Sequence, residues 1–337
     1  MSRHHRYWIA CFIFVGSVAM LCLSISEAAE APVKPKEKAK LDVFRYPPID
    51  MTKVSEVHTY REVDDVELKL YVFRPEGVEK EEKRAGIVFF FGGGWKSGSP
   101  GQFWKQCEYL ASRGMVAITA DYRVKKRHGV AAVKCVEDAN AAMRWVRTHA
   151  DMLGLDEQRL AASGGSAGGH LAAACAIFGD VGYERGYDSG AGEVRKCLAD
   201  LLVLYNPVMS LLPVGEQQFD FDREMLRERM GTPEVEDLSP YHHVREGLPT
   251  TLMMFGEKDV MLLGWANEYI GEAKALGNDV RLQTWPNRGH GFFNYGRGTF
   301  KVFKETMLAL DAFLVEHSYL EGEADENRLD EMDWRKS

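Results

Sequence analysis

A serine near the middle of the chain stands in a pattern suited to nucleophilic chemistry. Residues 164–168 read Gly-Gly-Ser-Ala-Gly and match G-x-S-x-G, with Ser166 at the centre. A short apolar segment, 159–162, precedes the pattern, and an alanine-rich segment, 167–178, follows it. A strand that turns sharply into a helix presents such a serine hydroxyl, and the start of the helix favours developing negative charge. The context predicts a nucleophile at Ser166, although the same five residues alone could be an ordinary glycine-rich turn.

A second glycine-rich segment, residues 89–95, reads Phe-Phe-Phe-Gly-Gly-Gly-Trp. Glycines directly after a buried strand let the backbone turn tightly and bring N–H groups close to a ligand. Acyl transfer requires such donors where a carbonyl oxygen becomes negative. We expect the N–H groups of Gly93, Gly94 and Ala167 to form an oxyanion hole; a flexible loop without this role is the alternative.

A reactive serine also needs a base, and a carboxylate to orient that base. Of the ten histidines, His290 is the best candidate, because it stands in a glycine-flanked loop after the last apolar strand. Asp259 follows another apolar strand, 250–255, and both loops are expected to leave the same edge of a sheet. Glu257, in the same loop as Asp259, is the alternative acid.

Two kinds of segment alternate along the chain and must position these residues. Segments with the patterns of strands are 54–60, 66–73, 87–91, 115–120, 159–162, 199–205, 250–255 and 280–285. Segments with helical spacing are 102–113, 133–152, 167–178, 262–276 and 300–317. The alternation predicts an α/β fold with a mostly parallel central sheet, helices on both faces and the first two strands as an antiparallel edge. Ligands bind at the carboxyl ends of such strands.

Taken together, the motifs resemble those of α/β-hydrolases in the hormone-sensitive-lipase-like carboxylesterase group. The resemblance is nearest to the bacterial acetylxylan- or feruloyl-esterase-like branch and covers residues 50–318. Its marks are the Gly-Gly-Gly-Trp loop, the segments 120–123, 164–170, 239–240 and 256–259, and Gly-His-Gly-Phe at 289–292. The chain order Ser166, Asp259, His290 is that of this superfamily. The resemblance implies an α/β-hydrolase fold and a serine esterase that needs no metal or organic cofactor.

One position departs from the pattern of that group. The family usually has histidine before the three glycines, whereas this chain has Phe91. The change removes a side chain that helps to brace the oxyanion loop but leaves the backbone donors, so we expect altered rather than lost activity. Asp121 and Arg123 are expected to be structural, pairing with polar groups of the following helix such as Asp138.

The resemblance implies hydrolysis of short-chain or plant-polysaccharide (acetyl or feruloyl) esters through an acyl-enzyme on Ser166. The partner would be a small-molecule or polysaccharide ester, with Trp95 and Phe292 as candidate contacts for its rings. Two alternatives stay open. One is a peptidase of the prolyl-oligopeptidase type, which would need a large additional domain; the other is a non-enzymatic binding protein on the same fold.

The ends of the chain predict further organisation. Residues 1–28 combine arginines, an apolar run and a small-residue cleavage site, as a secretory signal peptide does, and residues 29–45 resemble a linker. Secretion or periplasmic export is the expectation, with an uncleaved membrane anchor as the alternative. The catalytic domain is expected at 46–320, with a small cap insertion at 207–238. Residues 321–337 are expected to form a loosely attached acidic tail.

Net charge and cysteine positions indicate which partners, metal sites and disulfides are to be expected. The net charge of −8 argues against a nucleic-acid partner, since such proteins normally present a basic surface. Four cysteines lie beyond the predicted leader, and none has the spacing of a zinc site. Cys107, Cys135 and Cys175 lie in apolar helical patterns, which suits buried free thiols; the disulfide status of these three and of Cys197, and the oligomeric state, are left open.

Overall fold

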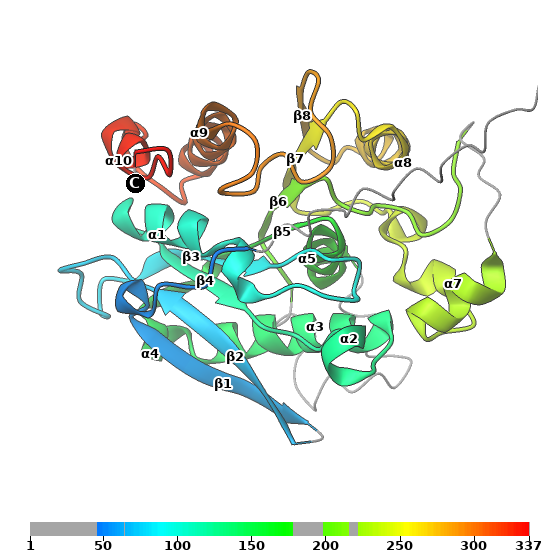
Figure 1. Cartoon of the computed structure of the whole chain (residues 1–337), viewed down its shortest axis with the longest axis horizontal. Coiled ribbons are helices and arrows are strands. Elements are labelled where there is room, and N and C mark those ends of the chain that lie inside the picture. Colours follow the sequence, from blue (N-terminus) through cyan, green and yellow to red (C-terminus); the bar gives the residue numbers. More distant parts are fainter. Residues whose placement is uncertain (1–45, 64, 178–197, 216–221, 337) are drawn as a thin grey trace, which may run out of the picture. The chain divides into compact units, whose positions relative to one another are not determined.

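A computed structural model describes residues 46–336 apart from residues 64, 178–197 and 216–221 (Figure 1). The predicted signal peptide and linker lie outside the described residues, as does Cys197. No helix within the described part of the chain is long and apolar enough to cross a membrane.

An eight-stranded sheet forms the centre of the fold, in the order β1-β2-β4-β3-β5-β6-β7-β8. The strands are β1 (Glu56–Val63), β2 (Val66–Phe73), β3 (Arg84–Phe90), β4 (Val116–Ala120), β5 (Leu155–Gly165), β6 (Leu201–Tyr205), β7 (Thr250–Gly256) and β8 (Val280–Trp285). β1 and β2 are antiparallel to their neighbours, and the pairs from β4 to β8 are parallel. The predicted sheet and its antiparallel edge are thereby confirmed.

Helices cover both faces of this sheet (Figure 1). The helices are α1 (Trp104–Ser112), α2 (Lys125–His128), α3 (Ala132–Thr148), α4 (Ala150–Leu153), α5 (Ala167–Ile177), α7 (Arg223–Met230), α8 (Val260–Ala275), α9 (Phe300–Glu316) and α10 (Glu326–Glu331). Alternate residues of β3 show the division: Val88 and Phe90 pack with α3 and α5, whereas Ile87 and Phe89 pack with α1 and α9. Successive side chains of a strand point to opposite faces, so one short strand contributes to two cores.

Several element boundaries differ from the predicted ones, and the largest differences are at β5 and at the predicted helix 133–152. β5 runs from residue 155, because the polar stretch before the apolar run also pairs with β3 at Arg84 and Leu155. The predicted helix 133–152 is divided at His149 into α3 and α4. β5 also continues to Gly165 instead of ending at residue 162, whereas β7 and β8 end within one residue of their predicted ends. The predicted site loops therefore still follow the carboxyl ends of strands.

The acidic tail is attached to the fold, so the expectation of a loose segment is wrong. Its helix α10 buries Leu329 completely and Met332 almost completely against the core that includes α1 and α9. Arg328 also forms an ion pair with Glu108 of α1, with 2.8 Å between the charged groups. The acidic composition concealed a few apolar residues whose burial offsets the cost of ordering the segment.

The cysteine prediction is confirmed for three residues. Cys107, Cys135 and Cys175 are buried free thiols. Burial raises the pKa of Cys107 well above its ordinary value and that of Cys135 as well, which keeps both in the unreactive thiol form.

Candidate active site

Ser166 occupies the sharp turn between β5 and α5. Its φ of 56° lies in the left-handed region, which is strained for a residue with a side chain. Glycines on either side make the turn possible: a Cβ at Gly168 would lie 2.0 Å from the carbonyl oxygen of Phe90. The Ser166 amide donates a hydrogen bond to Tyr205 of β6 at 2.8 Å, which fastens the turn to the sheet. The turn predicted from the G-x-S-x-G pattern is therefore present.

His290 lies between Ser166 and Asp259. Its Nε2 is 2.8 Å from Ser166 Oγ, and its Nδ1 is 2.6 Å from Asp259 Oδ2. Because the carboxylate can only accept, Nδ1 carries the proton and Nε2 is left to accept from the serine hydroxyl. Glu257 instead accepts a hydrogen bond from Thr284 Oγ1 at 3.0 Å. The geometry thus favours Asp259 over Glu257 as the acid.

Asn206 is a further member of this cluster that the sequence analysis did not identify. It follows β6 directly, is fully buried, and has a φ of 41°. Its Nδ2 donates to Asp259 Oδ2 at 2.6 Å, so the carboxylate is held by two donors, one from Asn206 and one from His290. The available signal was its position, a polar residue at the carboxyl end of a central strand.

The glycine loop presents amide groups beside the serine. Gly93 and Gly94 have φ values of 132° and 63°, and a Cβ at Gly93 would lie 2.0 Å from the Ser97 carbonyl oxygen. The Gly92 amide is already engaged with Gln102 Oε1. Among the described residues, by contrast, nothing accepts a hydrogen bond from the amides of Gly93, Gly94 or Ala167. These three donors are the ones predicted for an oxyanion hole.

Two cavities meet at Ser166 and His290, which line both. The larger cavity has a volume of about 690 Å³, and the smaller has a volume of about 260 Å³. The predicted cap segment, residues 207–238, supplies much of the wall of the larger cavity, and Trp95 also lines it. Phe292 is not among the residues that line these two cavities, and its contact with substrate stays a prediction. It packs on Trp285 with ring centroids 5.1 Å apart, and its neighbour Phe293 lines the smaller cavity instead.

The sequence profile of the alpha/beta hydrolase fold matches residues 87–294. The chain belongs to this family.

Several curated and solved proteins are similar to this hydrolase. Esterase LipC of Mycobacterium tuberculosis is 28% identical over 213 residues, covering 61% of this chain and 52% of LipC. The chain therefore spans about half the length of that relative. Esterase 2 of Thermogutta terrifontis phosphonylated by sarin is 43% identical with a TM-score of 0.76, covering 83% of this chain and all of that one. The butyrate-bound form of this esterase is 44% identical with a TM-score of 0.75, covering 82% and 99% of the two chains.

An aromatic pair braces the oxyanion loop of this hydrolase where its family usually has histidine. Phe91 is fully buried and stacks on Tyr122, with ring centroids 4.0 Å apart. Tyr122 also donates a hydrogen bond from its hydroxyl to the Phe91 carbonyl at 2.5 Å. The loop is thus held by ring stacking and by a hydrogen bond to its backbone, without a histidine at position 91.

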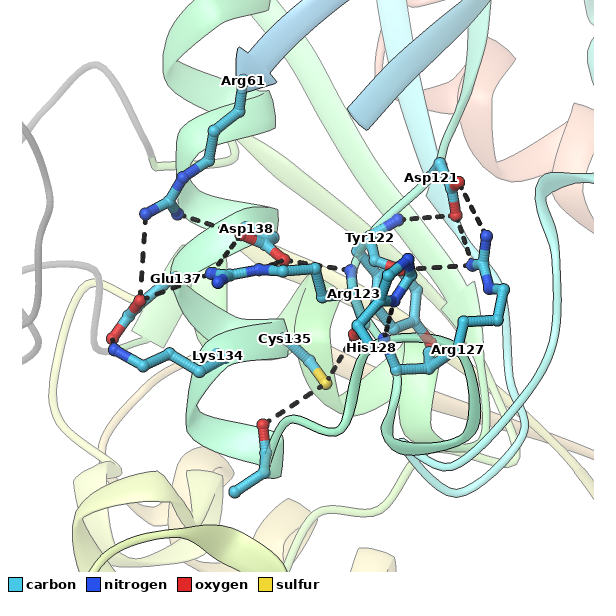
Figure 2. Close-up of polar contacts among 12 residues, drawn as sticks. Arg61, Asp121, Tyr122, Arg123, Arg127, His128, Lys134, Cys135, Glu137 and Asp138 are labelled. Atoms are coloured by element: carbon cyan, nitrogen blue, oxygen red, sulfur yellow. Dashed lines mark hydrogen bonds and ion pairs between the residues drawn. The ribbon is translucent and has the colours of Figure 1, made fainter. Parts of the chain in front are cut away.

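The segment that carries Tyr122 is anchored by buried charges (Figure 2). Arg123 donates from Nε and Nη2 to Asp138 of α3 at 2.8 and 2.9 Å, and Arg61 of β1 reaches the same carboxylate at 3.0 Å. The expected pairing of Arg123 with Asp138 is confirmed. Asp121 pairs instead with Arg127 in α2, with 2.6 Å between the charged groups.

That segment also contacts the oxyanion loop through its backbone. The amides of Lys125 and Lys126 donate to the carbonyls of Trp95 and Lys96 at 3.1 and 2.9 Å. The charged anchor at Asp138 is therefore linked to the glycine loop by two routes, one through Tyr122 and one through these amides. Asp121 and Arg123 act as structural residues, as expected.

A buried pair of amide side chains links the oxyanion loop to the histidine loop. Gln102 Oε1 accepts from the Gly92 amide, while Gln102 Nε2 donates to Asn294 Oδ1 at 2.7 Å. Asn294 Nδ2 then donates to the carbonyl of Gly291, next to His290, at 2.9 Å. Sequence patterns did not identify this bridge, because its two halves lie 192 positions apart.

No cluster of three or more histidine, cysteine or acidic residues within the described ranges is arranged to hold a metal ion.

Proposed function

We propose that this chain is a serine carboxylesterase that acts through an acyl-enzyme on Ser166. The observation that carries the proposal is the continuous line of contacts from Asp259 through His290 to Ser166, at 2.6 and 2.8 Å, beside three amides with no acceptor among the described residues. Relatives named as esterases support it, and so does the sarin adduct of the similar Thermogutta terrifontis esterase, because such a reagent phosphonylates an activated nucleophile.

The geometry supports a two-step reaction. His290 Nε2 accepts the proton of Ser166 as Oγ attacks the ester carbonyl, and Asp259 stabilises the imidazolium that forms. The amides of Gly93, Gly94 and Ala167 donate to the oxyanion. His290 then protonates the leaving alcohol, and a water activated by the same nitrogen releases the acid. This mechanism assigns Ser166, Asp259 and His290 as catalytic residues.

The two cavities support a division of the ester. The smaller cavity, about 260 Å³, has room for a short acyl chain such as acetyl or butyryl, while the larger, about 690 Å³, has room for a bulky alcohol such as a sugar. The butyrate-bound form of the similar esterase is consistent with a short acyl group. We therefore propose short-chain esters or plant-polysaccharide (acetyl or feruloyl) esters as substrates, and the size of the smaller cavity favours the short acyl groups.

Export of the protein remains part of this proposal. The pattern of residues 1–28 supports a cleaved signal peptide and a catalytic domain that begins near residue 46. N-terminal sequencing of the protein recovered outside the cytoplasm tests it: a mature chain that begins near residue 29 supports cleavage. An intact leader recovered with membranes would favour the anchor.

A panel of substrates tests the activity. Purified protein and its Ser166→Ala variant are assayed with 4-nitrophenyl acetate, butyrate and octanoate, acetylated xylan, methyl ferulate and a prolyl peptide 4-nitroanilide. Fast turnover of the acetate or butyrate by the native chain and none by the variant is the expected result. Preferential cleavage of the anilide would favour the peptidase alternative, and no turnover of any substrate would contradict an enzymatic role.

A further inference from the structure

The larger cavity contains an arginine that has no acidic partner in the described part of the chain. Arg229 of α7 lines the cavity and donates from Nη2 to the Gly94 carbonyl at 3.1 Å. Its guanidinium carbon also lies 5.1 Å from the ring centroid of Trp95. Neither contact neutralises the charge, and burial lowers the pKa of Arg229 below its ordinary value without an opposing contribution from a carboxylate.

The other arginines of α7 are differently placed. Arg227 is exposed, lies 3.8 Å from Glu224 and donates to the Pro233 carbonyl at 3.0 Å. Arg223 approaches Glu236 at 3.9 Å. Arg229 therefore differs from its neighbours on the helix in facing a cavity rather than solvent or an acid.

The acidic residues of the same cavity are engaged elsewhere. Asp222 caps α7 by accepting from the amides of Glu224 and Met225 at 2.9 and 3.1 Å. Glu228 is exposed and lies 3.7 Å from Lys125. Asp259 accepts from His290 and Asn206, as described above. Among the described residues, none of the carboxylates that line the cavity therefore forms an ion pair with Arg229.

The guanidinium of Arg229 has a hydrogen-bond donor that is not used. It has five N–H donors in a planar fork that suits a carboxylate, yet Nε is buried without an acceptor. A partly buried charge without a partner is costly, and an anionic ligand would remove that cost.

We propose that Arg229 is a specificity residue that binds a carboxylate carried by the alcohol part of the ester, such as a uronic acid or a hydroxybenzoate. The inference rests on the proposed esterase function and deepens it. Gly94 belongs to the oxyanion loop, so a carboxylate at Arg229 lies beside the reacting carbonyl. The alcohol part is the relevant one because the larger cavity is assigned to it.

Matched substrate pairs test the inference. The alcohol pair is 4-acetoxybenzoate against 4-tolyl acetate, and the acyl pair is monomethyl glutarate against methyl pentanoate. For each protein, the ratio of kcat/KM for the anionic ester to that for the neutral ester is measured at low and high salt. Arg229→Gln is expected to lower the alcohol-pair ratio by about tenfold or more, the effect expected for loss of a charge-assisted contact. Arg229→Lys should retain much of the ratio, and salt should weaken it.

Arg227→Gln is the matched control, because it removes the same charge from the same helix outside the cavity. Its ratio should stay within about twofold of that of the native chain, since exposed charges contribute little. An equal loss of the alcohol-pair ratio in Arg227→Gln and Arg229→Gln would overturn the inference. It would show that the positive charge of the helix acts at long range, rather than that Arg229 contacts the carboxylate. A loss in the acyl pair instead would support binding of an anion by Arg229 and reverse the assignment of the cavities.

The outcomes separate this inference from the proposed function. If both proteins hydrolyse neutral esters and Arg229→Gln leaves both ratios unchanged, Arg229 has no such role while the esterase proposal stands. If no ester is hydrolysed, the proposed function fails, and calorimetry with 4-acetoxybenzoate and the Ser166→Ala protein still decides the question. Equal affinity with and without Arg229→Gln would overturn the inference; circular dichroism and thermal unfolding establish that each variant is folded.

Discussion

The two cavities that meet at Ser166 are lined by different sets of residues. Apart from Ser166 and His290, the smaller is lined by the glycine loop, by Gly291 and by the buried amides of Gln102 and Asn294, together with the side chains of Tyr46, Phe293 and Arg297. The larger is lined mainly by side chains of the cap segment and of α8, and some of these are exposed, as Met225 is at 63%. The first is held by hydrogen bonds between elements distant in sequence, whereas the second depends on the sizes and charges of individual side chains.

This difference links the smaller cavity with the catalytic step and the larger cavity with the choice of substrate. A buried amide pair with its hydrogen bonds satisfied leaves little freedom to move, because any displacement exposes an unsatisfied group. Side chains on a connecting segment can change size without disturbing the sheet. We therefore expect substitutions around the smaller cavity to change kcat, and substitutions around the larger to change which ester is preferred.

Removing the hydroxyl shared by both cavities should have the largest effect. Ser166→Ala should lower the hydrolysis of 4-nitrophenyl acetate by about four orders of magnitude or more, because the nucleophile is lost. Ser163→Ala is the matched control on the same strand, since Ser163 donates to the Val203 carbonyl at 2.6 Å and is fully buried away from the site. Rates from both variants are compared by spectrophotometry. Substantial turnover by Ser166→Ala would reject the assignment.

Changing the acid should have the next largest effect. Asp259→Asn should lower kcat roughly 10³- to 10⁴-fold, because the amide no longer selects the tautomer of His290 that accepts a proton at Nε2. Glu257→Gln, the control in the same loop, should change kcat by less than about threefold, since the Glu257 carboxylate faces Thr284. Steady-state kinetics of the two variants decides between them, and the reverse ranking would reassign the acid to Glu257.

The frame of the smaller cavity can be tested through its amide bridge. Gln102→Leu should lower kcat by about tenfold to a hundredfold with a smaller change in KM, because the Gly92 amide and Asn294 lose their partner. Gln106→Leu offers a matched control, since Gln106 is buried on α1 and neither polar atom of its side chain has a partner in the described structure. Equal kinetic losses in the two variants would show that the bridge does not position the loops.

A substitution in the wall of the larger cavity should change only which ester is preferred. Leu226→Trp places a larger side chain in that cavity, so kcat/KM for 1-naphthyl acetate should fall by about tenfold, the range expected when a pocket loses room for part of a substrate. Methyl acetate, which needs little of the cavity, is the internal comparison and should change far less. An equal fall for both esters would mean that the two cavities are not separable in the way proposed.

A buried histidine beneath the larger cavity should affect stability rather than rate. His170 donates from Nε2 to the Leu238 carbonyl at 2.6 Å, and burial lowers its pKa from 6.5 to about 4. Between these values the unfolded chain binds more protons, so the free energy of unfolding falls as pH decreases from 6.5 to 4. The contribution is at most about 1.4 kcal/mol per pH unit. His170→Asn should flatten this dependence in urea unfolding, and an unchanged slope would exclude His170 as its source.

Much of the site could be predicted because its signals are local. Ser166 lies in a five-residue pattern between a strand and a helix, and Asp259 and His290 each follow an apolar strand. Parallel strands place their carboxyl ends at one edge, so three separate loops could be assigned to one place without coordinates.

Other features could not be predicted in this way. The surroundings of Phe292 could not be predicted, because only packing shows which of two adjacent aromatic residues lines a cavity. The acidic tail was misjudged because composition averages over the few residues that become buried. The partners of Gln102 and Asp259 also required coordinates, since Asn294 and Asn206 carry no motif of their own.

By itself, the sequence determined the alternation of strands and helices, the strained serine turn and the order of the three reactive groups, because each depends on residues close together in the chain. Only the tertiary structure decided which amides bridge the two loops, that Tyr122 stacks on Phe91, and that Arg229 faces a cavity with no ion-pair partner among the described residues. The physical reason is that burial and pairing are properties of surfaces brought together by folding, and no local pattern records which surfaces will meet.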